Sequence, residues 1–329
     1  MLQQLQDIVD RAQHIVIFSH RSPDGDTIGG NLALRDALES WGKSVTSVCA
    51  DPLPNVYDVL DGVALDLFHQ QWDKASTDLY INVDGSSTTQ LVYPEKDPTI
   101  LDGTVPFISI DHHVSNSYFG THNLVVPEAC STTYVLYHLF LQLRWSITPR
   151  IATYLLLGIY YDTGSLMHSN TSGDVMQVCG ELMRLGANRN QIMNVLYRQR
   201  TPGQLHAWGK ILESVTQNDD GVIMSGITTK EIESCGAKKE EIGGVVDYLN
   251  SVEGAKFAIL LSEDRENGIV KGSTRTRRDD VNLSEFCKMF GGGGHKKASG
   301  FGVAGKLKKG ESFSLIHENQ TRYPDIGML

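Results

Sequence analysis

Cysteine is scarce in this sequence, and no two cysteines lie close together. The five cysteines are spread over 329 residues and include no CxxC pair. A disulfide framework needs a denser, even-numbered set, and a structural zinc site needs paired thiolates, so neither is indicated. We therefore expect buried, reduced thiols.

Long apolar segments are also missing. The longest strongly apolar run, residues 151–161, is far shorter than the roughly 20 residues that a membrane-spanning helix needs. The first 13 residues place apolar side chains at helical spacing, whereas a signal peptide has a basic start and an unbroken apolar stretch. We expect a cytoplasmic protein with no membrane segment.

Positive charge is in short supply, because 29 Lys and Arg stand against 39 Asp and Glu, a net charge of -10. This balance disfavours a nucleic-acid binder, since phosphate contacts come from Lys and Arg. The average conceals a basic window, residues 265–309, which holds eleven Lys and Arg against four Asp and Glu. Taken alone, a solvated basic face explains this window as well as an anion-binding surface does.

The length predicts two domains, because single hydrophobic cores stop growing at roughly 250 to 300 residues. Over the first 130 residues, β-rich runs alternate with helical patterns, which is typical of a parallel sheet covered by helices. The expected strands are residues 14–20, 45–50, 78–84 and 106–113. Helical periodicity is found over residues 27–41, 131–143, 149–161, 173–185 and 190–199.

The C-terminal part predicts a smaller α+β domain, with β-rich runs and one helical stretch. The runs are residues 221–228, 256–263 and 268–275, and the helical stretch is 240–251. Residues 201–203, Thr-Pro-Gly, interrupt the helical pattern and indicate a hinge. We expect an α/β protein with a parallel-sheet domain over residues 1–190, a helical linker over 191–215 and the α+β domain over 216–329.

Four apolar runs end in acidic or imidazole side chains. These ends are His20-Arg21-Ser22-Pro23-Asp24-Gly25-Asp26, Asp84, Asp111-His112-His113 and Asp162. Each has a structural explanation: Asp84-Gly85 is a hairpin-turn pair, Asp24 and Asp26 can cap a helix, and Asp162-Thr163-Gly164 can end one. Their joint position at the ends of successive runs is harder to explain by turns, because parallel strands present their carboxyl ends at one edge of the sheet.

Several carboxylates brought together repel one another, and a multivalent cation is the natural compensation. Mixed carboxylate and imidazole ligands suit Mn, Fe or Co better than Mg or Ca. More than four candidate ligands are enough for two metals, which can activate a shared water and neutralise a departing phosphate oxygen.

The order of these motifs resembles the DHH phosphoesterase superfamily. HxxPDxD at residues 20–26, the isolated Asp84, Asp111-His112-His113 and Asp162 match its four motifs in order, and residues 291–300, GGGGHKKASG, are similar to the GGGHxxAxG signature of its C-terminal DHH-associated domain. The two-domain length is most similar to the bacterial nano-RNase and pAp-phosphatase group. Gly30, Gln90 and Ser299 stand where the family often has Ser, Arg and Ala.

The resemblance implies two Mn²⁺ per chain, with Mg²⁺ or Co²⁺ as substitutes. It assigns one metal to His20, Asp24 and Asp84 and the second to Asp26, Asp84, His112 and Asp162, so that Asp84 bridges.

It also implies roles outside the metal ligands. His113 would contact the scissile phosphate, Asp111 would orient the histidines, and Asn116 would lie on the substrate side. In the C-terminal domain, the residues expected to hold the nucleotide are Arg275, Gly293, Gly294 and His295. A bare run of glycines is more often a flexible linker, but His295 and the surrounding basic residues favour anion binding.

We therefore expect a phosphoesterase acting on short oligoribonucleotides, dinucleotides or pAp, and a homodimer is compatible with the sequence. A cyclic-di-AMP or pApA phosphodiesterase on the same scaffold is the closest alternative. A manganese pyrophosphatase is less favoured because that family lacks the GGGH signature. A nucleotide sensor without turnover is less favoured because all the metal-ligand positions are intact.

Overall fold

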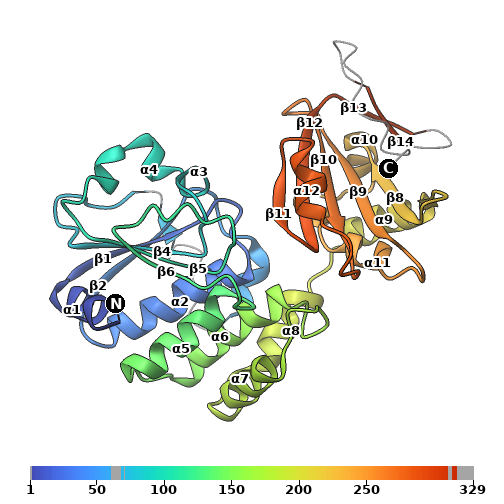
Figure 1. Cartoon of the computed structure of the whole chain (residues 1–329). Coiled ribbons are helices and arrows are strands. Elements are labelled where there is room, and N and C mark those ends of the chain that lie inside the picture. The colour runs from blue at the N-terminus through green and yellow to red at the C-terminus, as the bar shows by residue number, and fades with distance from the viewer. Residues whose placement is uncertain (1, 61–67, 70, 310–312, 317–329) are drawn as a thin grey trace. The chain divides into compact units, whose positions relative to one another are not determined.

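A computed structural model describes residues 2–60, 68–69, 71–309 and 313–316 of the chain (Figure 1). The chain divides into two compact units, Met1–Gln199 and Arg200–Leu329. Each unit has its own sheet and its own hydrophobic core. Among the residues described, no helix is long and apolar enough to cross a membrane.

The first unit is built on a parallel sheet of six strands in the order β3-β2-β1-β4-β5-β6. The strands are β1 (His14–Ser19), β2 (Ser44–Cys49), β3 (Phe68–His69), β4 (Leu79–Val83), β5 (Phe107–Asp111) and β6 (His122–Val125). The strand order runs outward from β1 in one direction and from β4 in the other. Such a reversal opens a crevice at the carboxyl ends of the two central strands, where α/β proteins bind ligands.

Helices lie on both faces of this sheet. The longer ones are α1 (Leu2–Arg11), α2 (Gly25–Glu39), α5 (Thr132–Leu143), α6 (Pro149–Asp162), α7 (Gly173–Arg184) and α8 (Arg189–Tyr197), and the short ones are α3 (Thr88–Leu91) and α4 (Tyr93–Lys96). Alternate residues of β1 enter opposite cores, with Ile15 and Ile17 on the α2 side and Val16 and Phe18 on the other. This double burial explains why the strand reads as a continuous apolar run.

Helices α2, α5 and α6 pack unusually closely beside the sheet. A Cβ atom added to Gly29 of α2 would lie 2.4 Å from the Tyr154 carbonyl oxygen of α6. One added to Gly158 of α6 would lie 2.3 Å from both an Asp26 carboxylate oxygen and the Thr133 hydroxyl. Glycine at both positions therefore brings the start of α2, the start of α5 and the end of α6 together.

The second unit contains a mixed sheet in the order β11-β12-β10-β9-β8-β7, in which the β8–β9 pair is parallel and the other pairs are antiparallel. Its strands are β7 (Thr216–Gln217), β8 (Val222–Ile227), β9 (Phe257–Asp264), β10 (Ile269–Arg275), β11 (Gly293–His295) and β12 (Ala298–Ala304), with a separate pair, β13 (Lys306–Lys309) and β14 (Phe313–Ile316). The helices are α9 (Pro202–Glu213), α10 (Thr229–Ser234), α11 (Val245–Leu249) and α12 (Leu283–Lys288).

The predicted fold class, a parallel α/β domain followed by a smaller α+β domain, is confirmed. Several details differ, and three of them have a clear reason. The short strands β3 and β6 carry no apolar run strong enough to predict, and the helix expected over residues 240–251 is broken into a 3₁₀ turn, Lys239–Ile242, and α11, because Gly244 takes a left-handed φ of 87°. The five cysteines are free thiols, and Cys235 differs from the other four in being only half-buried.

The close packing of α2 and α6 makes a stability prediction. Gly29→Ala should lower the free energy of unfolding of the first unit by about 1–3 kcal/mol, because the new methyl group collides with backbone. Gly180→Ala in α7 is the matched control, since its added Cβ meets no atom within 4 Å and should stabilise the helix by about 0.5–1 kcal/mol. Urea unfolding measures both, and a Gly29→Ala protein as stable as the wild type would contradict the packing argument.

Candidate metal centre

Acidic and imidazole residues of the first unit gather at the carboxyl ends of β1, β4 and β5. His20 follows β1, Asp84 follows β4, and Asp111 is the last residue of β5. Because these strands are parallel neighbours, their carboxyl ends lie side by side. The Nε2 atom of His20 is 3.5 Å from Asp84 Oδ2.

Asp84 is the buried centre of this group, with 2% of its surface exposed. One carboxylate oxygen accepts a hydrogen bond from the Thr27 hydroxyl at 2.7 Å, and the other accepts one from the Thr132 hydroxyl at 2.8 Å. Its φ of 67° is left-handed, a region that non-glycine residues seldom adopt and that is often found at functional sites. The backbone strain and the threonine hydroxyls together fix the direction of the carboxylate.

Asp24 and Asp26 lie at the start of α2. Asp24 is the N-cap of that helix and accepts hydrogen bonds from the backbone N–H groups of Asp26 and Thr27. Asp26 reaches across to α5, where its carboxylate accepts from the N–H groups of Thr132 and Thr133 at 2.6 and 2.9 Å. The capping explanation is therefore correct for Asp24, and Asp26 is held at the N-terminus of a second helix.

His112 and Asp162 approach the same point from β5 and α6. His112 Nε2 lies 3.1 Å from Asp162 Oδ2 and 3.8 Å from Asp84 Oδ1. The other ring nitrogen of His112, Nδ1, is 3.1 Å from the Ala129 carbonyl oxygen, which fixes Nε2 as the atom that faces the carboxylates. Asp162 comes from the end of a helix and not from a strand.

Within the part of the chain that the structure describes, three triads of this group have metal-binding geometry. They are His20, Asp24 and Asp84; Asp26, Asp84 and His112; and Asp84, Asp111 and His113. In each triad one ligand atom per residue lies within 4.8 Å of the others, and Asp84 belongs to all three. Carboxylate and imidazole donors in this number fit divalent transition metals, so the residues present suit two neighbouring ions.

The surrounding carboxylates raise the pKa values of the two histidines, His20 and His112. Burial disfavours the charged form of His20, but the hydrogen bond to Asp84 and the charges of Asp24 and Asp84 raise its pKa to about 10. Burial opposes charge on His112 as well, and the hydrogen bond and charge of Asp162 raise the pKa of His112 to about 11. Both imidazoles are therefore protonated at neutral pH when the carboxylates are their partners.

The pKa values of the carboxylates shift in two directions. Burial and the charge of Asp84 raise the pKa of Asp24 to about 6 and that of Asp26 well above its usual range. Burial acts in the same direction on Asp84, but the hydrogen bond from His20 and the charges of the histidines outweigh it and lower the pKa of Asp84. Asp84 therefore stays ionised, and its negative charge repels the carboxylates of Asp24 and Asp26.

The remaining predicted residues of this unit form a chain of hydrogen bonds behind the cluster. Asp111 Oδ1 lies 2.7 Å from His113 Nδ1, and Asp111 Oδ2 accepts from the Asn116 side-chain amide at 2.6 Å. Asn116 is 7% exposed, and its side-chain oxygen accepts from the Tyr118 N–H. Asn116 thus holds the loop after His113 in shape, a role that its position in the sequence does not reveal.

Sequence reasoning missed the threonines that organise the carboxylates. Thr27, Thr132 and Thr133 donate to Asp84 and Asp26, and the signal for them is only that each stands in the first turn of a helix next to the cluster. The structure also explains Gly30, because an added Cβ would lie 2.5 Å from a methyl carbon of Val83. Gln90 accepts hydrogen bonds from the N–H and hydroxyl of Ser86.

In the second unit, Arg275 and His295 lie in one row across three strands. Ala298 of β12 pairs with His295 of β11 on one side and with Arg275 of β10 on the other. Directly paired residues share a face of the sheet, so both side chains belong to the face that α9 and α11 partly cover. Two strand spacings put their backbones about 10 Å apart.

The sheet face beside this row has few side chains. Along β12, Phe301 and Val303 enter the core on one face, so Gly300 and Gly302 lie on the other. Gly293 pairs with Gly300, and an added Cβ at Gly293 would meet no atom within 4 Å. Gly294 adopts a φ of 136°, which requires glycine. A flat ligand can therefore lie directly on this backbone.

Arg275 is held in place by two contacts. Its Nε lies 3.2 Å from Asp247 Oδ1 of α11, and its Nη1 donates to the Thr274 carbonyl oxygen at 3.0 Å. Neither contact uses Nη2, and the side chain is 32% exposed. The guanidinium is thus oriented by the protein and still reaches solvent.

Comparison with known families and proteins agrees with both halves of this description. Residues 14–159 match the N-terminal domain of the DHH family, and residues 221–319 match the DHHA1 domain. A bifunctional oligoribonuclease and PAP phosphatase NrnA of Thermus thermophilus is 30% identical over 88% of this chain and 84% of its own length. The protein of the same name from Bacillus subtilis is 22% identical over 88% and 89%.

The fold also has a solved counterpart. The crystal structure of an exopolyphosphatase-related protein from Bacteroides fragilis matches with a TM-score of 0.84 at 24% identity, covering 93% of this chain and 91% of that one. This match supports the architecture of the two units.

The raised pKa values of His20 and His112 predict that metal binding releases protons. A metal ion binds neutral imidazole and ionised carboxylate, so at pH 7 binding should release two or more protons per chain, and affinity should rise with pH as these groups lose their protons more easily. Calorimetry with Mn²⁺ in buffers of different ionisation enthalpy counts the protons. His206→Gln, at an exposed histidine of the second unit, should leave the count unchanged, and pH-independent affinity would show that the assignment is incorrect.

Proposed function

The chain belongs to the DHH family of phosphoesterases and carries a DHHA1 domain, and from this membership we propose that it hydrolyses short oligoribonucleotides and 3'-phosphoadenosine 5'-phosphate (pAp) with two Mn²⁺ ions. It is a hydrolase of phosphoester bonds. The substrates are those in the names of its relatives from Thermus thermophilus and Bacillus subtilis. We place this activity in the cytoplasm.

The observation that carries the proposal is the position of Asp84. It stands at the reversal point of the sheet and belongs to all three metal-binding triads of this site, as the bridging ligand of a two-metal centre would. We assign His20, Asp24 and Asp84 to one ion. The second ion is assigned to Asp26, Asp84, His112 and Asp162.

When bound, the two ions supply an activated water and neutralise charge on the phosphate. The protein contributes a positioned imidazole beside them. The contact with Asp111 fixes His113 Nδ1, so Nε2 is the atom that can meet a phosphate oxygen. Burial opposes charge on His113, but the hydrogen bond to Asp111 and the charge of Asp84 raise its pKa. The protonated His113 can therefore donate a hydrogen bond from its Nε2–H group to a phosphate oxygen.

The second unit supplies the grip on the nucleotide. We assign Arg275 and His295 to a phosphate remote from the reacting one, because the basic window surrounds them and Asp247 orients the guanidinium. The open backbone at Gly293, next to the glycine-specific turn at Gly294, is suited to a ribose or base lying against the sheet. Such a site would bind one end of a short nucleotide and would make few additional contacts with a longer strand.

A cyclic-di-AMP or pApA phosphodiesterase remains the alternative, since it would use the same two metals and the same anion-binding residues. A manganese pyrophosphatase is less favoured, because pyrophosphate has no ribose or base to lie against the glycine face beside Arg275. A sensor without turnover does not need an intact set of six metal-binding side chains.

A substrate panel tests the proposal. With Mn²⁺ added after chelation, a diribonucleotide and pAp should be hydrolysed, a long single strand much more slowly, and Ca²⁺ should not support turnover. Asp84→Asn should abolish activity while the fold survives, because asparagine tolerates a positive φ and keeps one acceptor oxygen. Hydrolysis of cyclic-di-AMP alone would favour the alternative, and activity of Asp84→Asn with full Mn²⁺ occupancy would contradict the bridging role.

Arg275→Ala separates binding from chemistry. The loss of a charge-assisted contact worth about 1.5–3 kcal/mol should reduce kcat/KM for a diribonucleotide by roughly 10- to 150-fold. A nitrophenyl phosphoester that needs no remote grip should be hydrolysed almost normally by this variant and by His295→Ala.

The matched control is Arg265→Ala, which removes the same charge near the opposite end of the β9–β10 hairpin. It should leave both substrates nearly unaffected. Equal proportional losses on the two substrates for Arg275→Ala would instead mean that Arg275 acts in the chemical step or in folding.

A further inference from the structure

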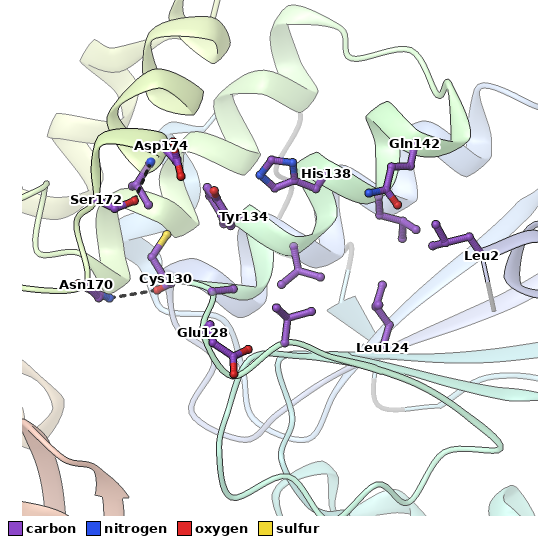
Figure 2. Close-up of a pocket in the computed structure, with 15 residues that line it drawn as sticks. Leu2, Leu124, Glu128, Cys130, Tyr134, His138, Gln142, Asn170, Ser172 and Asp174 are labelled. Atoms are coloured by element: carbon purple, nitrogen blue, oxygen red, sulfur yellow. Dashed lines mark hydrogen bonds between the residues drawn. The ribbon is translucent and has the colours of Figure 1, made fainter.

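A cavity of about 450 Å³ lies in the first unit, and none of the side chains assigned to the metal ions lines it (Figure 2). One wall is α5, the opposite wall is the segment 124–130 that begins in β6, and the start of α7 closes one side. This volume is typical of a site for a small organic molecule. Neither the mechanism nor the nucleotide grip uses it.

The cavity is acidic toward one end and more apolar toward the other, where Gln142 is the polar residue labelled beside Leu2 (Figure 2). Figure 2 shows Glu128 and Asp174 toward the end that contains Cys130 and Asn170, and Leu2 and Leu124 toward the opposite end. Both carboxylates belong to exposed residues at the rim, where solvent reaches them. The residues that line the cavity include two acidic side chains and no Lys or Arg.

The wall between the two ends is aromatic. Tyr134 and His138 lie on the same face of α5, with ring centroids 4.6 Å apart. Burial lowers the pKa of His138, so its ring is neutral at physiological pH and offers one nitrogen as an acceptor. The tyrosine hydroxyl is a second acceptor beside it.

We propose that this cavity binds a small organic cation, a primary ammonium group on an apolar body. The two carboxylates attract the ammonium group, and the acceptors of Tyr134 and His138 can share its three N–H donors. Phosphate-bearing molecules, including the substrates proposed above, are repelled by the same carboxylates. A hydrated metal ion would leave the apolar end unfilled.

The cavity also adjoins residues that hold two of the proposed metal ligands. The Ala129 carbonyl oxygen contacts His112 Nδ1, and the Asn170 amide donates to the carbonyl oxygens of Cys130 and Asp162. A ligand that shifts these residues shifts His112 and Asp162 with them. We therefore expect occupancy to change the turnover rate, an effect that rests on the proposed function, whereas binding itself does not.

Binding is tested on the full-length protein with a charge series of matched shape. The probes are 2-phenylethylamine, neutral 2-phenylethanol, anionic 3-phenylpropionate and ethylamine, which lacks the apolar body. Calorimetry and ligand-observed NMR should find 2-phenylethylamine at least fivefold tighter than each of the other three. Equal affinity for the alcohol, or for ethylamine, would overturn the proposal, because either the charge or the body would then contribute nothing.

A double variant, Glu128→Gln with Asp174→Asn, locates the site. It keeps the shape of both side chains and should weaken 2-phenylethylamine at least fivefold with unchanged circular dichroism. The matched control is Glu253→Gln with Asp219→Asn, at exposed positions of the second unit, and should bind like the wild type. Unchanged affinity in the first double variant would place the amine elsewhere and overturn the site.

The effect on the metal centre has its own readout. With Mn²⁺ bound, saturating 2-phenylethylamine should change kcat for a nitrophenyl phosphoester at least twofold in the wild type and leave the Glu128→Gln, Asp174→Asn protein unaffected. Tight binding without any change in kcat would overturn the link to His112 and Asp162. An inactive wild-type enzyme on every substrate would count against the proposed function, while the calorimetric result would still decide the cavity.

Discussion

The buried carboxylate of Asp84 is the constraint around which the first unit is organised. A charge with only 2% of its residue exposed must be compensated, and the protein does so with two threonine hydroxyls and with the imidazoles around it. Each compensating group comes from a different segment: Thr27 from the start of α2, Thr132 from the start of α5 and His20 from the end of β1. The contacts of Asp84 with these three residues therefore fix how α2, α5 and β1 are placed relative to β4.

The close approach of α2, α5 and α6 around the carboxylates requires glycines inside α2 and α6, and these glycines lower the stability of the helices. Gly29, Gly30 and Gly158 lie inside helices, where each weakens the helix by roughly 0.5–1 kcal/mol relative to alanine. A side chain at Gly158 would collide with Asp26 itself, and one at Gly30 would collide with β4 just before Asp84. At these three positions a larger residue would favour the helix but would collide with a neighbouring element, and at Gly158 it would collide with a carboxylate of the site.

The sequence predicts the central part of this arrangement because the ends of parallel strands must meet. That rule alone brings His20, Asp84 and Asp111 together, since each directly follows or ends a strong apolar run. It cannot find Thr132, which lies 48 residues beyond Asp84 and is chosen by helix packing, or the short strands β3 and β6, whose register depends on their neighbours. The break at Gly244 was hidden for a similar reason, because the apolar spacing continues through it.

The two units differ in charge: the first contains the carboxylate cluster, and the second contains the basic window. The carboxylates proposed to bind metal in the first unit would repel a phosphate-bearing substrate until cations occupy the site. The basic window of the second unit, residues 265–309, attracts phosphate whether or not metal is present. In the proposed reaction, a short nucleotide would therefore need one neutralised centre and one basic contact. The rest of the chain is acidic, so the further phosphates of a longer strand would meet more repulsion there than attraction, which agrees with the proposed preference for short substrates.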